Sequence, residues 1–167
     1  MPDKETKERA EKDRREGKSP TTQAGEFVRE EFHHIREGKH GARSPQQAIA
    51  IGLSKARRAG VPLRPPKAGR VSERTRQSAT RAYRAGQKRS RRKPSRTRSR
   101  AITRALRREG THAASHAAIG RQTRRVARQR SAGERRQIAR KAARSRTPAQ
   151  RSASARKAAR TRARHSA

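Results

Sequence analysis

Eight of the thirteen residues from 88 to 100 are Lys or Arg, and none is acidic. Arginine presents a planar, permanently charged fork that meets two phosphate oxygens at once, whereas lysine acts as a point charge. The Ser and Thr side chains between the cations add hydroxyl groups that also contact phosphate. This spacing predicts binding to a phosphate backbone, with an affinity that comes largely from counterion release and falls steeply as salt is raised.

Basic side chains continue from this run to the end of the sequence. Residues 1–40 hold ten Lys or Arg and ten Asp or Glu, so all of the formal net charge of +36 lies after residue 40, where 39 cations face three acids. Such a chain repels itself and needs a polyanion to become compact. The residues expected to bind nucleic acid are Lys88, Arg89, Arg91, Arg92, Lys93, Arg96, Arg98, Arg100, Arg124, Arg125, Arg135, Arg136, Arg140, Lys141, Arg144, Arg156, Lys157 and Arg160.

The composition narrows the class of polyanion. Single-strand and RNA modules usually present stacking aromatic residues, but the basic part has only Tyr83. Membrane-surface helices need a bulky apolar face, whereas this part is rich in Ala. We therefore expect binding and compaction of duplex DNA without sequence preference, with no membrane partner. An RNA- or ribosome-associated protein is the alternative, because its electrostatics would be identical.

Catalytic and metal-binding patterns are not evident. No carboxylate pair, Gly-rich phosphate loop or nucleophile–base arrangement stands out in the basic part, so we expect neither an enzyme nor a cofactor. His33, His34 and His40 lie near Glu30 and Glu37. The chain has no Cys, however, and the spacing shows no third ligand, so the sequence predicts no metal site.

Residues 19–60 have the pattern of a helical hairpin. Ser19-Pro20 and Ser44-Pro45 are helix starts, each with a capping hydroxyl and Pro at the first helical position. Gly38 and Gly60 end the two helices. Apolar residues recur between them at helical spacing. The expected core and interface residues of the hairpin are Phe27, Val28, Phe32, Ile35, Ile49 and Leu53.

So small a core is marginal for a unit of about 40 residues. We therefore expect the hairpin to form a homodimer through residues 19–60 or to pack a third helix. Gly52, in mid-stripe, suggests a close contact between the helices. The first helix is net acidic, which suits protein contact better than DNA. A protein-interaction adaptor acting through the hairpin is thus a second alternative function.

The rest of the chain is too poor in apolar residues to predict a core. Only 28% of residues are hydrophobic, and 37% are charged, a composition typical of disorder. Residues 1–18 are expected to be a solvated mixed-charge tail, 61–66 a Pro-rich spacer, and 67–167 a basic tail. The fold class is mainly α: a small helical hairpin with a largely disordered, helix-prone basic tail that folds on phosphate. Its helix-permitting blocks are 72–85, 99–109, 113–130, 133–146 and 148–164.

The stretch 31–41, with its Glu-Phe and Gly-Lys pairs, precedes Gln-Ala-Ile-Ala-Ile-Gly-Leu-Ser-Lys-Ala at 47–56. Together these residues resemble a family of small basic bacterial proteins catalogued as a domain of unknown function. The resemblance implies a bacterial origin and brings no activity. Residues 101–167 are similar in composition to the Ala/Lys/Arg tails of linker histones and bacterial histone-like proteins.

The sequence also bears on location. No apolar run approaches the roughly 20 residues of a membrane span, and the start at 1–5 lacks a signal-peptide core. We expect a cytoplasmic, nucleoid-associated protein in a bacterium, or a nuclear protein in a eukaryote.

Overall fold

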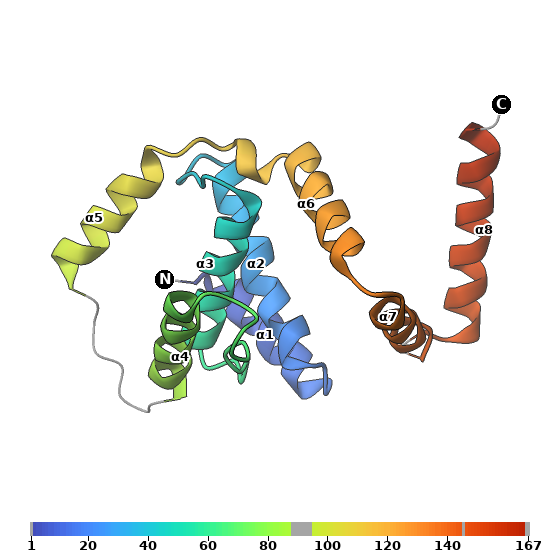
Figure 1. Ribbon diagram of the computed structural model, residues 1–167, viewed down its shortest axis with the longest axis horizontal. Coiled ribbons are helices and arrows are strands. Elements are labelled where there is room, and N and C mark those ends of the chain that lie inside the picture. The colour runs from blue at the N-terminus through green and yellow to red at the C-terminus, as the bar shows by residue number, and fades with distance from the viewer. Residues whose placement is uncertain (1, 88–94, 145, 166–167) are drawn as a thin grey trace. The chain divides into compact units, whose positions relative to one another are not determined.

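The computed structural model describes residues 2–87, 95–144 and 146–165, and within them every regular element is helical (Figure 1). The chain divides into two compact units, Met1–Gln122 and Thr123–Ala167. No helix in the described ranges is long and apolar enough to cross a membrane. The elements are α1 (Lys4–Arg15), α2 (Pro20–Arg36), α3 (Pro45–Arg58), α4 (Glu73–Gln87), α5 (Arg96–Arg107), the 3-10 helix η1 (His112–Ala114), α6 (His116–Gln129), α7 (Ala132–Arg144) and α8 (Pro148–His165).

Helices α2 and α3 form the hairpin that the sequence predicts. Ser19 Oγ accepts a hydrogen bond from the N–H of Thr22 at 3.4 Å, and Ser44 Oγ accepts one from the N–H of Gln47 at 3.2 Å. Each bond satisfies one of the backbone donors left open at a helix start. A left-handed glycine, Gly38 at φ 72°, ends the turn after α2. The hairpin is therefore specified by hydrogen bonds between residues close in sequence.

Gly52 brings the two helices into close contact, as the sequence predicts. A Cβ atom at this position would lie 2.7 Å from Val28 Cα and 3.0 Å from Phe27 O. Both are backbone atoms, which cannot move aside as a flexible side chain can. The approach offsets the low helix propensity of a glycine inside α3.

We predict that Gly52→Ala destabilises the protein by up to about 2 kcal/mol. Overpacking costs about 1–3 kcal/mol, which outweighs the gain of about 1 kcal/mol in helix propensity. The matched control is Gly25→Ala, because Gly25 lies inside α2 with no atom within 4 Å of an added Cβ. Urea unfolding should show the control unchanged or stabilised. Equal behaviour of both variants would contradict the close contact.

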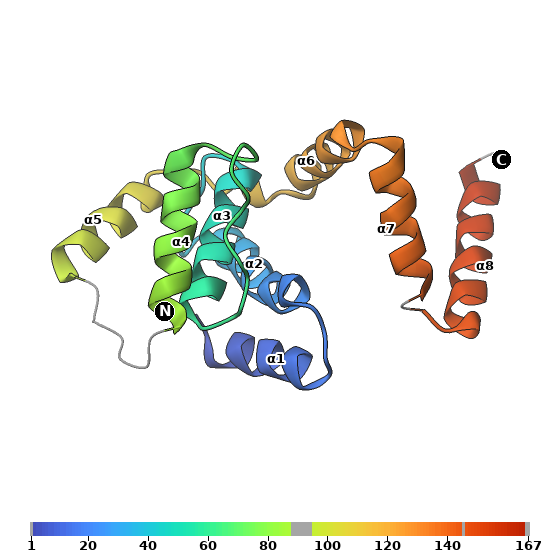
Figure 2. The same cartoon turned by 60° about the horizontal axis from the view of Figure 1, so that its bottom comes forward.

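Helix α1 packs against α2, so residues 4–15 are not the solvated tail that the sequence predicts (Figure 2). Ala10 is 5% exposed and joins Phe27, Ala56 and Val61 in an apolar cluster. An ion pair of 2.8 Å between Arg9 Nε and a carboxylate oxygen of α2 lies beside it. The prediction failed because α1 contributes alanine and a buried Thr, which give no apolar periodicity.

Helix α4 packs on α3 and begins the part of the chain expected to be disordered. It buries Ala79 and Ala82. Gly86 approaches the carbonyl of Arg57 so closely that a Cβ atom would overlap it. The Pro-rich segment 61–66 is also tied to this unit, since its first residue is buried in the cluster around Phe27 and Ala10.

A second apolar cluster lies around the connection between α2 and α3. Ile35, Ala42 and Ala48 pack there with Ala113 and Ala114 of η1. The N–H of Gly41 donates to Leu106 O at 2.9 Å, the N–H of Ala42 donates to Gly110 O at 3.1 Å, and Arg36 Nε donates to Ala114 O at 2.9 Å. Residues 106–114, part of the predicted basic tail, are therefore docked on the hairpin.

The expectation of a largely disordered tail is not confirmed, because each predicted block carries a helix. Arg and Ala have high helix propensity, and all five helices begin with a hydroxyl that accepts a hydrogen bond from the N–H three residues on. These caps are Ser72, Ser95, Ser115, Ser131 and Thr147. Each cap is worth about 0.5–2 kcal/mol. Local capping thus opposes the repulsion between neighbouring Arg residues.

The predicted hairpin core is partly confirmed. Phe27 and Ile35 are buried at 1% and 0% exposure, whereas Val28, Phe32, Ile49 and Leu53 are half-buried. The hairpin gains its additional packing from α1 and α4 of the same chain, which confirms the expected third helix. Homodimerisation through residues 19–60 stays a prediction.

Candidate nucleic-acid interface

Helix α5 carries a row of four arginines on one face, which we call the α5 stripe: Arg96, Arg100, Arg104 and Arg107. Their i, i+4, i+8, i+11 spacing places them within an arc of about 80°, at 3.6 residues per turn. All four side chains are exposed. Successive cations in the first three positions are about 6 Å apart along the helix axis, so the stripe is a continuous line of positive charge.

The surroundings of the α5 stripe leave its charge uncompensated. The helix contains no acidic residue, and none of the four arginines forms an ion pair with any residue in the described ranges. Ile102 and Leu106 occupy the opposite face, and the carbonyl of Leu106 is the atom bound by Gly41. The stripe is therefore presented by a helix whose end is attached to the hairpin.

Helix α6 repeats this arrangement. Arg121, Arg124, Arg125 and Arg128 follow i, i+3, i+4, i+7 spacing and are exposed within an arc of about 100°. The apolar side chains of this helix, including Val126, lie on the opposite face. The helix contains no acidic residue. It thus presents a second line of cations.

Helices α7 and α8 carry cations around most of their circumference. Neither has a buried residue in the described ranges. The one acid of α7, Glu134, accepts a hydrogen bond from the N–H of Ser131 at 2.9 Å in a capping box. Helix α8 contains six Lys or Arg and no acid. Both helices can therefore contact phosphates from several directions.

The structure places the predicted phosphate-binding residues as follows. Lys88, Arg89, Arg91, Arg92 and Lys93 lie outside the described residues. The other thirteen lie on the exposed surfaces of α5, α6, α7 and α8, as Arg96, Arg98, Arg100, Arg124, Arg125, Arg135, Arg136, Arg140, Lys141, Arg144, Arg156, Lys157 and Arg160.

Four further arginines complete the two stripes and were missed from the sequence. They are Arg104 and Arg107 on α5, and Arg121 and Arg128 on α6. Their spacing of three or four residues was the available signal. It becomes decisive only when the block is known to be helical, because that spacing has no meaning in a disordered chain.

The acidic residues of α2 do not form the acidic surface that the sequence suggested. Glu30 and Glu31 are 4% and 0% exposed, and Glu26 pairs with Arg9 of α1. Glu37 pairs with Lys39 at 2.9 Å. Most of the carboxylates of α2 and the residue after it are thus buried or paired with cations of the same chain.

Comparisons with protein-family models, with curated proteins and with solved structures gave no match to this chain. The resemblance of residues 31–56 to small basic bacterial proteins, and the bacterial origin that it implies, stay predictions. Function is therefore inferred from this chain's own residues.

Proposed function

We propose that this protein binds nucleic acid through the phosphate backbone, with duplex DNA as the favoured ligand and without sequence preference. The α5 stripe carries this proposal: four exposed arginines lie on one face of a helix that has no acid. Duplex DNA carries one negative charge about every 1.7 Å of its axis. A line of fixed guanidinium groups therefore finds phosphate partners at any position along a duplex.

The side-chain inventory supports backbone contacts over base reading. Base edges are read mainly by Arg, Lys, Asn, Gln, Asp and Glu held in one register within a groove. Helix α5 offers only arginine among these types, and its other side chains are Ser, Thr and small or apolar residues. Arginine alone binds phosphates on any sequence. We infer that position on the duplex is set by charge, with little discrimination between bases.

Each unit has enough charge to bind a separate stretch of duplex. Residues 1–122 contain 33 Lys or Arg against 12 acids, and residues 123–167 contain 16 against one. A chain with two basic units can bridge two duplexes or two parts of one duplex. We propose DNA compaction on this basis, in the nucleoid of a bacterial cytoplasm or, in a eukaryote, in the nucleus. A homodimer through residues 19–60 would add further basic units to the assembly.

Phosphate also acts on the helices themselves. Since α7 and α8 bury no residue in the described ranges, they receive no stabilisation from a core. Repulsion between their neighbouring arginines opposes the helical state, and bound phosphates remove it. We propose that these helices become more stable when the protein binds DNA.

The experiment that tests this function is a salt titration of the full chain with duplex DNA and with a structured RNA. We expect the logarithm of the binding constant to fall with the logarithm of salt concentration at a slope of about −4 or steeper, since each neutralised phosphate contributes about −0.9. Scrambled duplexes of equal length should bind equally.

The other outcomes lead to the alternative functions. Tighter binding to RNA at every salt concentration would indicate an RNA- or ribosome-associated protein. Binding that is weak and insensitive to salt would reject backbone recognition. Attention would then move to the hairpin as a protein-docking adaptor.

A further inference from the structure

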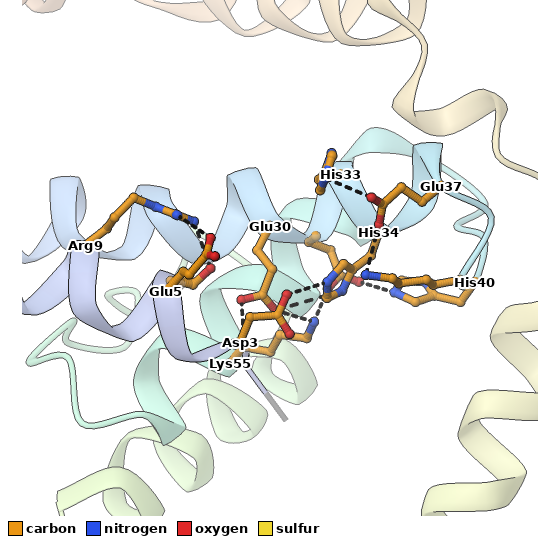
Figure 3. Close-up of polar contacts among 12 residues, drawn as sticks. Asp3, Glu5, Arg9, Glu30, His33, His34, Glu37, His40 and Lys55 are labelled. Atoms are coloured by element: carbon orange, nitrogen blue, oxygen red, sulfur yellow. Dashed lines mark hydrogen bonds and ion pairs between the residues drawn. The ribbon is translucent and has the colours of Figure 1, made fainter.

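A second group of residues is independent of the arginine stripes. The C-terminal half of α2 carries three buried ionisable residues, Glu30, Glu31 and His34. Figure 3 shows Glu30 and His34 beside Asp3, His40 and Lys55. Lys55 of α3 and His40 of the α2–α3 connection complete the group. We call these five residues, with Asp3, the polar cluster. Burying so many ionisable groups is costly unless their charges are balanced.

The positive charge of Lys55 does not balance the buried acids of the polar cluster. Lys55 Nζ lies 2.6 Å from Glu31 Oε2 and 3.2 Å from Glu30 Oε1. A single lysine side chain therefore faces two buried carboxylates.

Glu31 has an oxygen directed away from Lys55. Both of its carboxylate oxygens are shielded from solvent and accept no well-aligned hydrogen bond from the residues described. Oε1 lies 3.3 Å from His40 Nε2, so this oxygen faces an imidazole nitrogen inside the protein. Glu31 therefore offers a buried anionic oxygen to a further positive charge.

His40 is oriented so that a neutral ring directs a lone pair at this oxygen. Its Nδ1 lies 3.1 Å from the carbonyl oxygen of Gly41. A carbonyl only accepts hydrogen bonds, so Nδ1 carries the proton. In the neutral ring, Nε2 then points an unshared electron pair toward Glu31 Oε1. A proton or a metal ion between these two atoms would remove the repulsion between the lone pair and the carboxylate.

His34 is held in the same manner by a carboxylate. Its Nε2 lies 2.9 Å from Asp3 Oδ2. A carboxylate oxygen accepts hydrogen bonds, so Nε2 donates to it, and in the neutral ring Nδ1 is left with the lone pair that a metal ion could bind. Nδ1 lies 3.9 Å from Glu30 Oε1, within the polar cluster. Metal-binding histidines commonly donate their other N–H to such an outer acceptor.

We propose that Glu31, His34 and His40 bind a divalent transition metal ion of the zinc class. One ligand atom from each residue lies within 4.8 Å of the other two. Two ligands at about 2.0–2.1 Å from a tetrahedral zinc ion are about 3.3 Å apart, which matches the 3.3 Å between Glu31 Oε1 and His40 Nε2. Two imidazoles and one carboxylate favour such a metal over magnesium or calcium.

Glu30, at the adjacent position on α2, lies beside these three ligands but is not grouped with them, so a water molecule would complete a four-coordinate site. Oε1 of Glu30 already faces His34, and Glu30 forms a second group of three potential ligands with His34 and Asp3. A metal ion here would join α2 to the loop after it and, through Asp3, to the start of α1. We therefore assign it a structural role in the first unit.

The sequence did not predict this site because its ligands are not regularly spaced. From the sequence, the two acids considered as ligands beside the histidines were Glu30 and Glu37, and Glu31 was not among them. The structure pairs Glu37 with His33 at 3.0 Å on the surface instead. Only the return of the chain after Gly38 brings His40 back to α2.

The proposal is tested by titrating the untagged full chain with Zn²⁺ in a competition assay against a chromophoric chelator. We expect one Zn²⁺ per chain with a Kd below about 1 µM, in line with structural zinc sites. His40→Gln and Glu31→Gln should each weaken binding by about 100-fold or more. Asp3→Asn should weaken it by about 10–100-fold, as loss of an outer hydrogen-bond acceptor does.

His33→Gln is the matched control, since His33 lies beside His34 on α2 with its side chain 68% exposed. It should bind Zn²⁺ within about twofold of the unaltered chain. Circular dichroism identifies any variant that fails to fold. The cobalt absorption spectrum of the unaltered chain needs no variant, because a four-coordinate site gives intense visible bands and hydrated cobalt does not.

Three results would overturn the proposal. The first is the absence of Zn²⁺ binding by the unaltered chain, which would assign the positive charge between Glu31 and His40 to a proton. The second is equal loss in His33→Gln and His40→Gln, which would indicate binding by surface histidines. The third is the spectrum of hydrated cobalt at saturating protein.

Discussion

Replacing the α5 stripe by glutamine, as R96Q/R100Q/R104Q/R107Q, is expected to weaken binding to duplex DNA by about 100-fold near physiological salt. The slope of the logarithm of the binding constant against the logarithm of salt concentration should become shallower by about 3.6, since each of the four lost phosphate contacts contributes about 0.9. Glutamine and arginine have similar helix propensity, so α5 itself should persist. Fluorescence anisotropy at several salt concentrations measures both quantities.

A second variant separates the stripe from net charge. K4Q/K7Q/K12Q/R15Q also removes four positive charges, but it removes them from exposed positions of α1, a helix that contains acidic residues as well. It should change DNA affinity by less than about threefold and leave the salt slope unchanged, because α1 carries four acids among its cations and Lys4 and Lys12 already form ion pairs. Equal losses in the two variants would mean that binding depends on total charge and that α5 is not the interface.

Lys55→Met is expected to lower the free energy of unfolding by about 3–5 kcal/mol. Removing one partner of a buried ion pair leaves an uncompensated buried charge, and here two acids lose their shared cation. Glu30 and Glu31 side chains are only 2% and 0% exposed, so water cannot replace the ammonium group. Urea unfolding in EDTA measures the effect without any contribution from bound metal.

Lys39→Met is the control for this prediction. Lys39 also pairs with a glutamate, Glu37, at 2.9 Å, but these side chains are 55% and 39% exposed. Exposed ion pairs contribute about 0–1 kcal/mol, so Lys39→Met should lower the free energy of unfolding by no more than about 1 kcal/mol. Glu31→Gln combined with Lys55→Met should recover part of the loss. A Lys55→Met variant no less stable than the control would show that Lys55 does not neutralise the polar cluster.

The sequence by itself determined the helices after residue 19, because their signals are local. Ser19 and Ser44 start the hairpin helices with hydrogen bonds that span three residues. The tail helices begin in the same way, as at Ser131 and Thr147, which both form capping boxes. The low content of apolar residues led to the expectation of disorder, whereas the caps and the Arg/Ala propensity predict helix. The stripe on α5 follows directly once that block is helical.

Only the tertiary structure decided what packs on the hairpin. Helix α1 contributes Ala10, α4 contributes Ala79 and Ala82, and η1 contributes Ala113. Alanine lies on exposed as well as on buried helix faces of this chain, so its positions carry no periodic signal. Close approach of backbones, as at Gly41, depends on segments that are far apart in the sequence.

The polar cluster shows the same division. The sequence placed Glu31 and His34 on one helix but did not predict that His40, Lys55 and Asp3 would meet them. Each of these comes from a different element, and their meeting depends on how α1, α2, α3 and the connecting loop pack. Hydrogen bonds between near neighbours can be read along a chain, whereas the balance of buried charges is set by residues that only the folded chain brings together.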